Sequence, residues 1–536
     1  MENYEILTVI YHEKFNYVIA DDRGLNRSCL RPQEFREFIN AHGCDVVELK
    51  IISCYLLMEI FSNEAVADHV KMAKFPNLRK LELNGMSFTP EWLNMLSNCC
   101  GQLETLNFEN CSNGQGAPVQ LAVDIKLEIL QKFPHLKEIT LHNYDFYSLT
   151  IEYPKWQELL GNLPLQALHL NDRIIGKSST DNELRGQNTT AQLAELSLKT
   201  SLAQEKWLGN FPKFLRNFEK LTTLRIEVLE TITQKMLQTL AEKCKDLQIL
   251  QITNSTFDPT LSVVSWPENL KELALFHCRG LNFGNLQEIL QNHPKLTKFI
   301  SKSTEYQYEK VENFQISPGL QSLEMDCKYL WQLQELSNML HNNHIKELIW
   351  HHEKQNCQLS EKPIPAAETY VDLPKLQKLI IPHHKASFGH ITELLQHSSL
   401  EDLTVMHCGE YSGVTCEEVP SVEAAAAFQS NITQLSIPLD IFNEHLDFWL
   451  DFFAKNSKMA TLSCTFTFED FEYSQFLKRL IENPNFPEDL KKLDIFGYTI
   501  DCNDLRNHFN ALINKLENEN CEDLYRIVLS KEKQIK

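Results

Sequence analysis

Hydrophobic residues recur at fixed offsets in the segment 269–300, NLKELALFHCRGLNFGNLQEILQNHPKLTKFI. Leu270, Leu273 and Leu275 lie at offsets 0, 3 and 5, and Cys278 follows at offset 8. The two-residue spacing of Leu273 and Leu275 is typical of a strand that turns both side chains to the same face. The pattern therefore predicts a short strand followed by a buried turn.

The second half of this segment has the spacing of a helix. Leu286, Ile289 and Leu290 fall on one face of a helix. Pro294 cannot continue that helix, and Leu296 begins the next strand pattern. A strand and a helix that recur with a period of about 20–29 residues are typical of a leucine-rich repeat. One unit cannot bury its own apolar face, whereas stacked units share a continuous core.

The same pattern recurs along most of the chain. About eighteen strand starts lie between Val46 and Leu524, with a mean period of about 28 residues. Proline two residues before the strand leucine marks several boundaries, because proline ends the preceding segment. The expected fold is an α/β leucine-rich-repeat solenoid, a curved stack with parallel strands on the concave face and helices on the convex face.

Two regions follow from the extent of the repeat. Residues 1–45 are expected to form an irregular N-terminal cap, and residues 46–536 are expected to form the solenoid. The elements expected near the two ends are strands at 4–11 and 15–20, a helix at 32–41, a helix at 503–516 and a strand at 524–529.

Three segments interrupt the repeat. Residues 171–192 are polar, residues 352–372 contain two prolines without a helix pattern, and residues 409–431 insert extra residues. Insertions in solenoids form loops beside the sheet and often belong to a binding surface. Tolerated drift of the sequence explains these loops equally well.

Charge narrows the class of partner. The chain carries a formal net charge of −21, from 51 lysines and arginines and 72 aspartates and glutamates. Such a surface repels phosphate backbones, so no nucleic-acid partner is expected. Basic partner proteins are favoured in principle, although acidity also serves solubility.

The cysteines indicate a reducing compartment. Of the fifteen, Cys54, Cys111, Cys278 and Cys408 lie at offset 8, where a free thiol behaves as a small hydrophobe. The N-terminus has no basic-then-apolar signal segment, and no apolar run approaches the roughly 20 residues that span a bilayer. The expected location is cytoplasmic or nuclear, with no membrane partner.

Catalytic motifs are incomplete in this sequence. Residues 176–178, Gly-Lys-Ser, match the end of a phosphate-binding loop, but Asn171 stands where its first glycine is required. Asn356 replaces the second histidine of a zinc-protease motif, and no Cys-x-x-Cys pair is present. We therefore expect a protein that is not an enzyme, with no catalytic residue, no cofactor and no metal.

Histidines form one unusual column. His352, His383 and His407 lie at offset 7 of three consecutive repeats. Equivalent positions on neighbouring strands lie about 5 Å apart, so this column is able to bind a metal or to respond to pH. The simpler interpretation, which we favour, is that they are turn residues hydrogen-bonded to the backbone.

Strands such as LETLNFENC at Leu103, LKELALFHC at Leu270 and LEDLTVMHC at Leu400 resemble cysteine-containing leucine-rich-repeat proteins, in particular the insect F-box/leucine-rich-repeat family. The segment 30–51 is similar to the start of the repeats that follows an F-box in that family. The resemblance covers residue 30 to the C-terminus. It implies the substrate-binding arm of an SCF-type ubiquitin ligase, in which the F-box binds a Skp-type adaptor of a cullin complex and the repeats hold the substrate.

The F-box itself is not found. Residues 1–29 lack its Leu-Pro-x-Glu opening and are too short for the module. Two functions therefore stay open: a ligase arm that recognises a substrate, and a leucine-rich-repeat scaffold or inhibitor protein that recruits no ligase. The repeat motif is specific for fold and weakly specific for function.

The strand pattern also predicts where a protein partner binds. If offsets 3 and 5 point into the core, offsets 2, 4 and 6 point to the concave face. From Leu270 to Leu400 these offsets expose apolar side chains rimmed by charge, whereas earlier repeats are mainly polar there. Such a surface is typical of an interaction site, unless the loop 352–372 covers it. The predicted partner-binding residues are Glu272, Phe276, Ile300, Glu324, Asp326, Glu347, Ile349, His351, Ile380, Asp402 and Met406.

Overall fold

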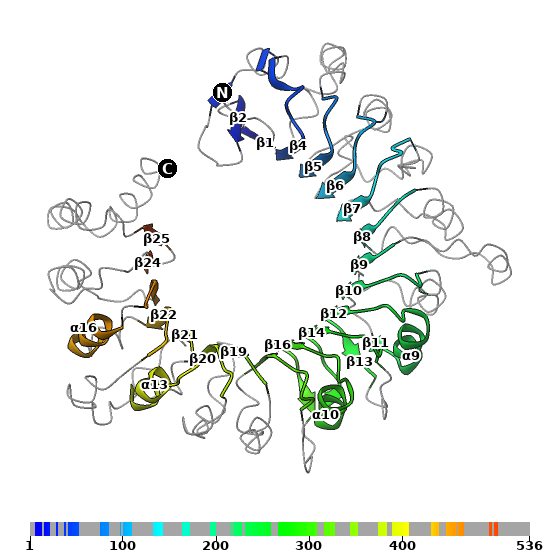
Figure 1. Ribbon diagram of the computed structural model, residues 1–536. Helices are drawn as coiled ribbons and strands as arrows, with labels where there is room; N and C mark the ends of the chain where they lie inside the picture. Colours follow the sequence, from blue (N-terminus) through cyan, green and yellow to red (C-terminus); the bar gives the residue numbers. More distant parts are fainter. Residues whose placement is uncertain are drawn as a thin grey trace. The chain divides into compact units, whose positions relative to one another are not determined.

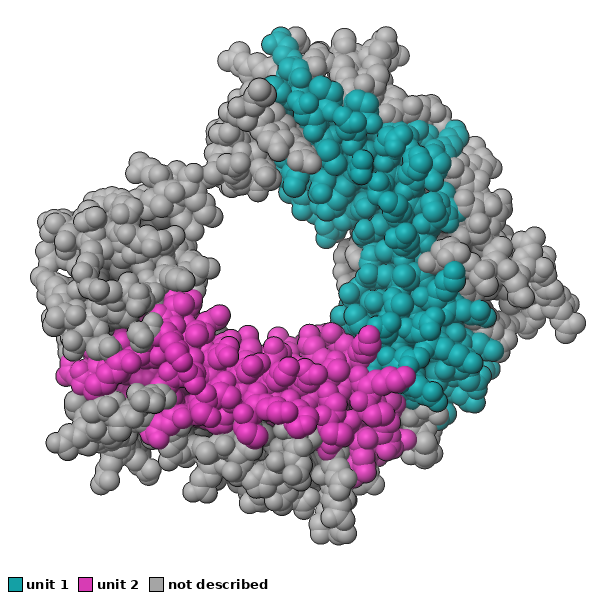
Figure 2. All heavy atoms as spheres, viewed as in Figure 1, with its two compact units in different colours: residues 1–270, 278–281 teal, residues 271–277, 282–536 magenta. Residues whose placement is uncertain are grey.

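The structure is a computed structural model of the chain. Two compact units are distinguished, unit 1 with residues 1–270 and 278–281 and unit 2 with residues 271–277 and 282–536 (Figure 2). The structure describes residues 6–12, 16–21, 28–30, 37–38, 41–52, 75–84, 97, 100–109, 132–142, 163–171, 193–199, 215, 218–227, 231–258, 266–307, 316–326, 344–351, 374–382, 388–406, 430–438, 446–456, 458–465, 492–495 and 498–501.

Unit 1 is built on parallel strands of five residues each, and each strand pairs with the next one in sequence order (Figure 1). Helix α9 (Gln234–Lys243) lies on one side of these strands, and the short strands β11 (Thr231–Ile232) and β13 (Thr256–Phe257) pair beside it. The main strands are β4 (Glu48–Ile52), β5 (Lys80–Asn84), β6 (Thr105–Glu109), β7 (Glu138–His142), β8 (Ala167–Asn171), β9 (Glu195–Lys199), β10 (Thr223–Glu227) and β12 (Ile249–Thr253).

The N-terminal strands join the repeat sheet. Strand β1 (Ile6–His12) lies parallel to β4 and antiparallel to β2 (Asn16–Asp21), which in turn pairs with β3 (Ser28–Leu30). A hairpin therefore adds its strands directly to the edge of the repeat sheet. The two strands expected at 4–11 and 15–20 are confirmed within one or two residues.

Unit 2 continues the same plan. Its parallel strands again pair in sequence order, and an antiparallel strand, β25 (Tyr498–Asp501), joins the last of them. The elements are β14 (Glu272–Phe276), β15 (Leu281–Asn282), α10 (Phe283–Asn292), β16 (Lys298–Lys302), β17 (Tyr306–Gln307), β18 (Ser322–Asp326), β19 (Glu347–His351), β20 (Lys378–Pro382), α13 (Phe388–Leu395), β21 (Asp402–Met406), β22 (Gln434–Pro438), α16 (Leu446–Lys455), β23 (Thr461–Thr465) and β24 (Lys492–Ile495).

Burial follows the predicted offsets. Leu273 and Leu275 are completely buried, as is Leu270 just before the strand begins, whereas Glu272 and Phe276 are half-buried. Strict alternation occurs in β4, β5, β10, β12, β19 and β21, because strand side chains alternate between the core and the opposite face. In β14, β16 and β18 additional residues of the opposite face are buried as well. The chain is therefore a leucine-rich-repeat solenoid, as its sequence pattern predicts.

The turn after the strand explains the residue at offset 8. Cys278 is completely buried, and its thiol donates to the carbonyl of Ile252 across 3.5 Å. Thr304 takes the same place after β16 and donates to the carbonyl of Leu275 across 3.1 Å. A small side chain with a donor group fits this turn, which confirms the expected buried position of Cys278. The residue at offset 7, just before this position, has a positive φ angle in three consecutive repeats, namely Asn254, His277 and Ser303.

Several sequence-based expectations lie outside the described residues. These are the interiors of the loops 171–192, 352–372 and 409–431, most of the helix at 32–41, the helix at 503–516, the strand at 524–529, and the residues Cys54, Cys111, His352, His383, Cys408 and His407.

Candidate functional site

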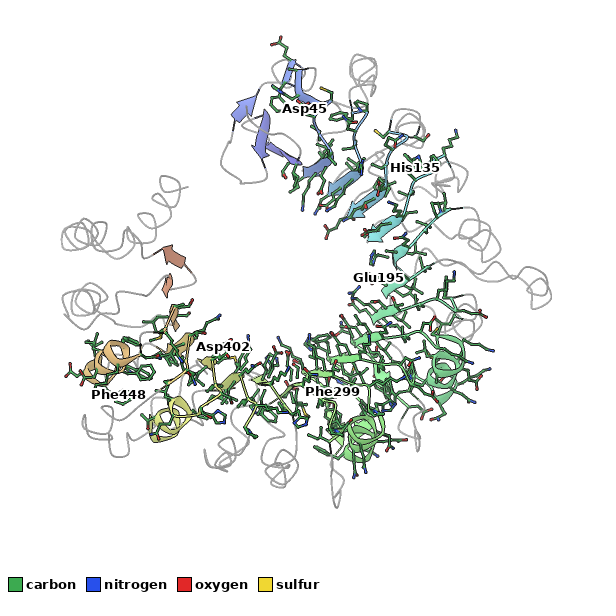
Figure 3. All side chains as sticks on the ribbon, in the orientation of Figure 1. Asp45, His135, Glu195, Phe299, Asp402 and Phe448 are labelled. Carbon is green, nitrogen blue, oxygen red and sulfur yellow. The ribbon has the colours of Figure 1, made fainter. Side chains whose placement is uncertain are left out.

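The predicted partner-binding residues lie on one face of unit 2. We call this surface the strand face of unit 2, defined as offsets 2, 4 and 6 of β14, β16 and β18–β21. The face lies opposite α10, α13 and α16, and Figure 3 shows Asp402 on the strand side and Phe448 on α16. The buried residues at offsets 3 and 5 separate the two sides, as Leu348 and Trp350 do in β19.

Parallel pairing arranges these residues in three rows across the strands, because equivalent positions lie directly opposite one another. The middle row, at offset 4, brings Ile349 of β19 opposite Ile380 of β20. Both side chains are half-buried, and adjacent parallel strands lie about 4.8 Å apart. Two isoleucines separated in sequence by a loop therefore form one contiguous apolar surface.

The first row, at offset 2, carries alternating charges. Lys298 pairs with Glu272 across 3.6 Å, and Lys378 pairs with Asp402 across 3.0 Å. Ser322 donates a hydrogen bond to Glu347 across 2.9 Å. Ion pairs between partly exposed side chains contribute roughly 0.2–1 kcal/mol each. The set of residues predicted from the sequence omitted both lysines. The alternation of acidic and basic residues at offset 2 of neighbouring repeats is the sequence pattern that predicts these ion pairs.

Glu324 and His351 meet in the centre of the strand face. The imidazole Nε2 contacts the carboxylate Oε1, and both side chains are largely covered. Burial alone would raise the pKa of Glu324, but the hydrogen bond and charge of His351, together with Lys302 and Lys298, lower that pKa below its ordinary value. Glu324, which lies opposite Ile349 in the middle row, is therefore held in its ionised form.

Two predicted surface residues are not at the surface, and the prediction is wrong for them. Asp326 is 2% exposed, and its carboxylate accepts hydrogen bonds from the backbone amides of Ser303 and Thr304 across 3.0 and 3.2 Å. The positive φ of Ser303 belongs to the turn that presents these amides. Asp326 thus closes a turn. Ile300 is only 8% exposed, between Ala274 and Glu324 on the neighbouring strands.

The other predicted residues keep a partly accessible position. Phe276 and Met406 are half-buried at the ends of their strands, and Glu272, Glu347 and Asp402 are half-buried in the first row. None is fully exposed. In unit 1 the equivalent face is mainly polar, with ion pairs from Lys50 to Glu82 (3.3 Å) and from Lys80 to Glu82 (2.9 Å). The apolar contrast predicted from the sequence therefore coincides with unit 2.

The structure offers no metal centre in the part of the chain that it describes, where no group of three histidines, cysteines or carboxylates is arranged to hold an ion. The histidine column lies outside that part, so its two interpretations stay predictions. No helix among the described residues is long and apolar enough to cross a membrane.

No protein-family model matches the chain. Similar solved structures include the TLR13–ssRNA13 complex, with 14% identity, a TM-score of 0.42, and coverage of 86% of this chain and 63% of the receptor chain. A leucine-rich-repeat protein of Leptospira interrogans has 14% identity, a TM-score of 0.30, and coverage of 85% of this chain and 98% of that chain. Yeast Rad7, in its complex with Elc1, has 12% identity, a TM-score of 0.35, and coverage of 87% and 93%. The assignment of the fold rests on the strand register and burial described above.

Proposed function

We propose that this chain is a protein-binding solenoid that docks its partner on the strand face of unit 2, and that it performs no catalysis. The observation that carries the proposal is the apolar pair Ile349 and Ile380, placed side by side next to the charged first row and to Glu324. An apolar centre with a charged rim matches the usual anatomy of an interface between proteins.

The surface of Ile349 and Ile380 that is still accessible can contribute free energy to binding when a partner buries it. Complete burial of an exposed aliphatic side chain stabilises by about 1.5–3 kcal/mol, and half-buried isoleucines retain part of that gain. Such anchors usually lie near the centre of an interface, surrounded by residues that exclude water. Phe276 of β14 and Met406 of β21 are two further half-buried apolar side chains on the strand face.

For the cellular role we propose substrate recognition in an SCF-type ubiquitin ligase, which is supported by the resemblance of the repeats. The ligase form needs a Skp-type adaptor and a cullin as further partners. A scaffold or inhibitor without ligase recruitment is the second candidate, since the repeat motif by itself is weakly specific for function. We place both roles in the cytoplasm or the nucleus.

The test replaces the apolar pair and captures partners. Ile349→Glu and Ile380→Glu place a charge at the proposed interface, whereas Ile249→Glu makes the same change on the strand side of β12 in unit 1. Each variant is first shown to melt like the wild type. We expect specific partners to be lost from the first two variants and retained by the third, as measured by quantitative mass spectrometry after affinity capture.

The outcome also separates the two roles. Recovery of Skp and cullin with the wild-type chain supports the ligase role, and their absence with other partners present supports the scaffold. If partners bind both isoleucine variants as they bind the wild type, the docking surface does not lie on the strand face of unit 2.

A further inference from the structure

The charges in the first row of the strand face do not balance. This row crosses β14, β16 and β18–β21 at offset 2, and parallel pairing aligns its members. Three of them are carboxylates and two are lysines. The members of the row are Glu272, Lys298, Ser322, Glu347, Lys378 and Asp402.

The excess negative charge falls on Glu347. Lys298 pairs with Glu272. The Cα of Lys378 lies opposite those of both Glu347 and Asp402, and its ammonium pairs with Asp402. The hydrogen bond that Glu347 accepts comes from the neutral hydroxyl of Ser322. Among the described residues, no lysine, arginine or histidine lies within ion-pair distance of this carboxylate.

The surroundings of Glu347 favour the binding of a positively charged side chain of a partner. Its side chain is half-buried, so its ionised form is partly deprived of water without gaining a charged partner. Two residues further along β19, Ile349 begins the apolar pair on the same face. A segment that covers this pair also covers the carboxylate, and burying an unpaired charge would be costly.

We propose that the partner docks with a lysine or arginine side chain on Glu347 and an aliphatic side chain on Ile349 and Ile380. This inference rests on the proposed function, because it names the chemistry of the partner at that docking surface. Charge complementarity selects the partner here, since a basic group completes the unbalanced row while an acidic one is repelled. An arginine has the further advantage of two parallel hydrogen bonds to the carboxylate.

The probe is a library of random dodecapeptides displayed on phage and selected on the immobilised full-length protein. We expect the recovered peptides to combine a basic residue with a nearby aliphatic one. Synthetic copies of these peptides are then titrated against each variant. Glu347→Gln is expected to weaken binding by about fivefold and Glu347→Lys to weaken it further, as for a partly shielded ion pair. Glu401→Gln removes an exposed carboxylate just outside the face and is expected to leave affinity unchanged.

The results distinguish a failure of the proposed docking surface from a failure of the proposed basic contact at Glu347. Peptides that bind Ile349→Glu and Ile380→Glu as tightly as wild type would overturn both the docking surface and this inference. Peptides that need the isoleucines but contain no basic residue, or that bind Glu347→Gln normally, would overturn only this inference. Selection that yields no binding peptide also counts against it. If Glu347→Lys fails to fold, the isosteric Glu347→Gln still provides the test.

Discussion

The Ser301 hydroxyl and the Tyr306 phenol oxygen lie 2.7 Å apart, and both residues are buried in unit 2. Ser301 occupies offset 5 of its repeat, where most repeats carry a large apolar side chain. Phe299 at offset 3 is completely buried as usual. The hydrogen bond satisfies a polar group inside the core, and it explains how a repeat with a weak sequence pattern still packs.

Removal of one partner from this bond should be costly. Tyr306→Phe leaves the Ser301 hydroxyl buried without that partner, and we expect a loss of about 1–2 kcal/mol in the free energy of unfolding, measured by urea denaturation. In the double variant Ser301→Ala, Tyr306→Phe both polar groups are absent, so stability should partly recover. A double variant that loses the sum of the two single losses would contradict the pairing.

A charge in the repeat core should be far more damaging. Leu273 is completely buried, so Leu273→Asp forces an unpaired carboxylate among apolar side chains. We expect a loss of at least about 4 kcal/mol, visible as a large drop in melting temperature. Lys271→Asp, an exposed position two residues earlier, is the control and should melt like wild type. A Leu273→Asp protein with normal melting would show that the register at Leu270 is wrong.

His277 offers a stabilising substitution. Its φ angle of 52° lies in the left-handed region, which costs residues with a Cβ about 1 kcal/mol. Its side chain is exposed, so little packing is lost on removal. We expect His277→Gly to raise the free energy of unfolding by roughly 0.5–1 kcal/mol. His277→Ala retains the Cβ and should give no such gain; equal effects of both variants would argue against backbone strain.

Glu324 should make stability depend on pH in the acidic range. Its pKa is lowered in the folded protein, so the stabilising contribution is present above the pKa of an unfolded glutamate and is lost as pH falls through the folded value. We expect Glu324→Gln to be less stable than wild type at neutral pH, with the difference fading below about pH 4. Melting temperatures of both proteins between neutral and acidic pH test this, with Glu401→Gln as the exposed control.

The cysteines should differ sharply in reactivity. Cys44 is exposed, whereas Cys100, Cys244 and Cys278 are buried. Burial raises the pKa of Cys244 to about 12, so its thiol stays protonated and unreactive at neutral pH. We expect alkylation of the native protein at Cys44 but not at Cys244, as measured by peptide mass spectrometry. Modification of both thiols after denaturation is the control, and native labelling at Cys244 would contradict its burial.

The sequence predicted the repeat, its register and its core, because leucine spacing depends only on strand and helix geometry. Leu273 and Leu275 point inward, and Cys278 fills the buried turn, as expected. Alternation also predicted correctly which residues share the strand face. Ile349 and Ile380 lie on that face together for this reason, although 31 positions separate them in sequence.

Tertiary structure alone decided which of those residues are accessible and which charges are paired. The periodicity of the sequence assigns a side chain to a face of the sheet. It predicts neither the path of the turn that follows the strand nor which carboxylate a lysine side chain pairs with. Asp326 is buried because the turn after β16 presents two backbone amides to it. The flexible side chain of Lys378 can reach either flanking strand, and it pairs with Asp402. Glu347 therefore accepts a hydrogen bond only from the hydroxyl of Ser322 among the described residues. Hydrogen bonds and ion pairs between repeats depend on distances of a few ångströms, which the spacing of residues along one chain does not specify.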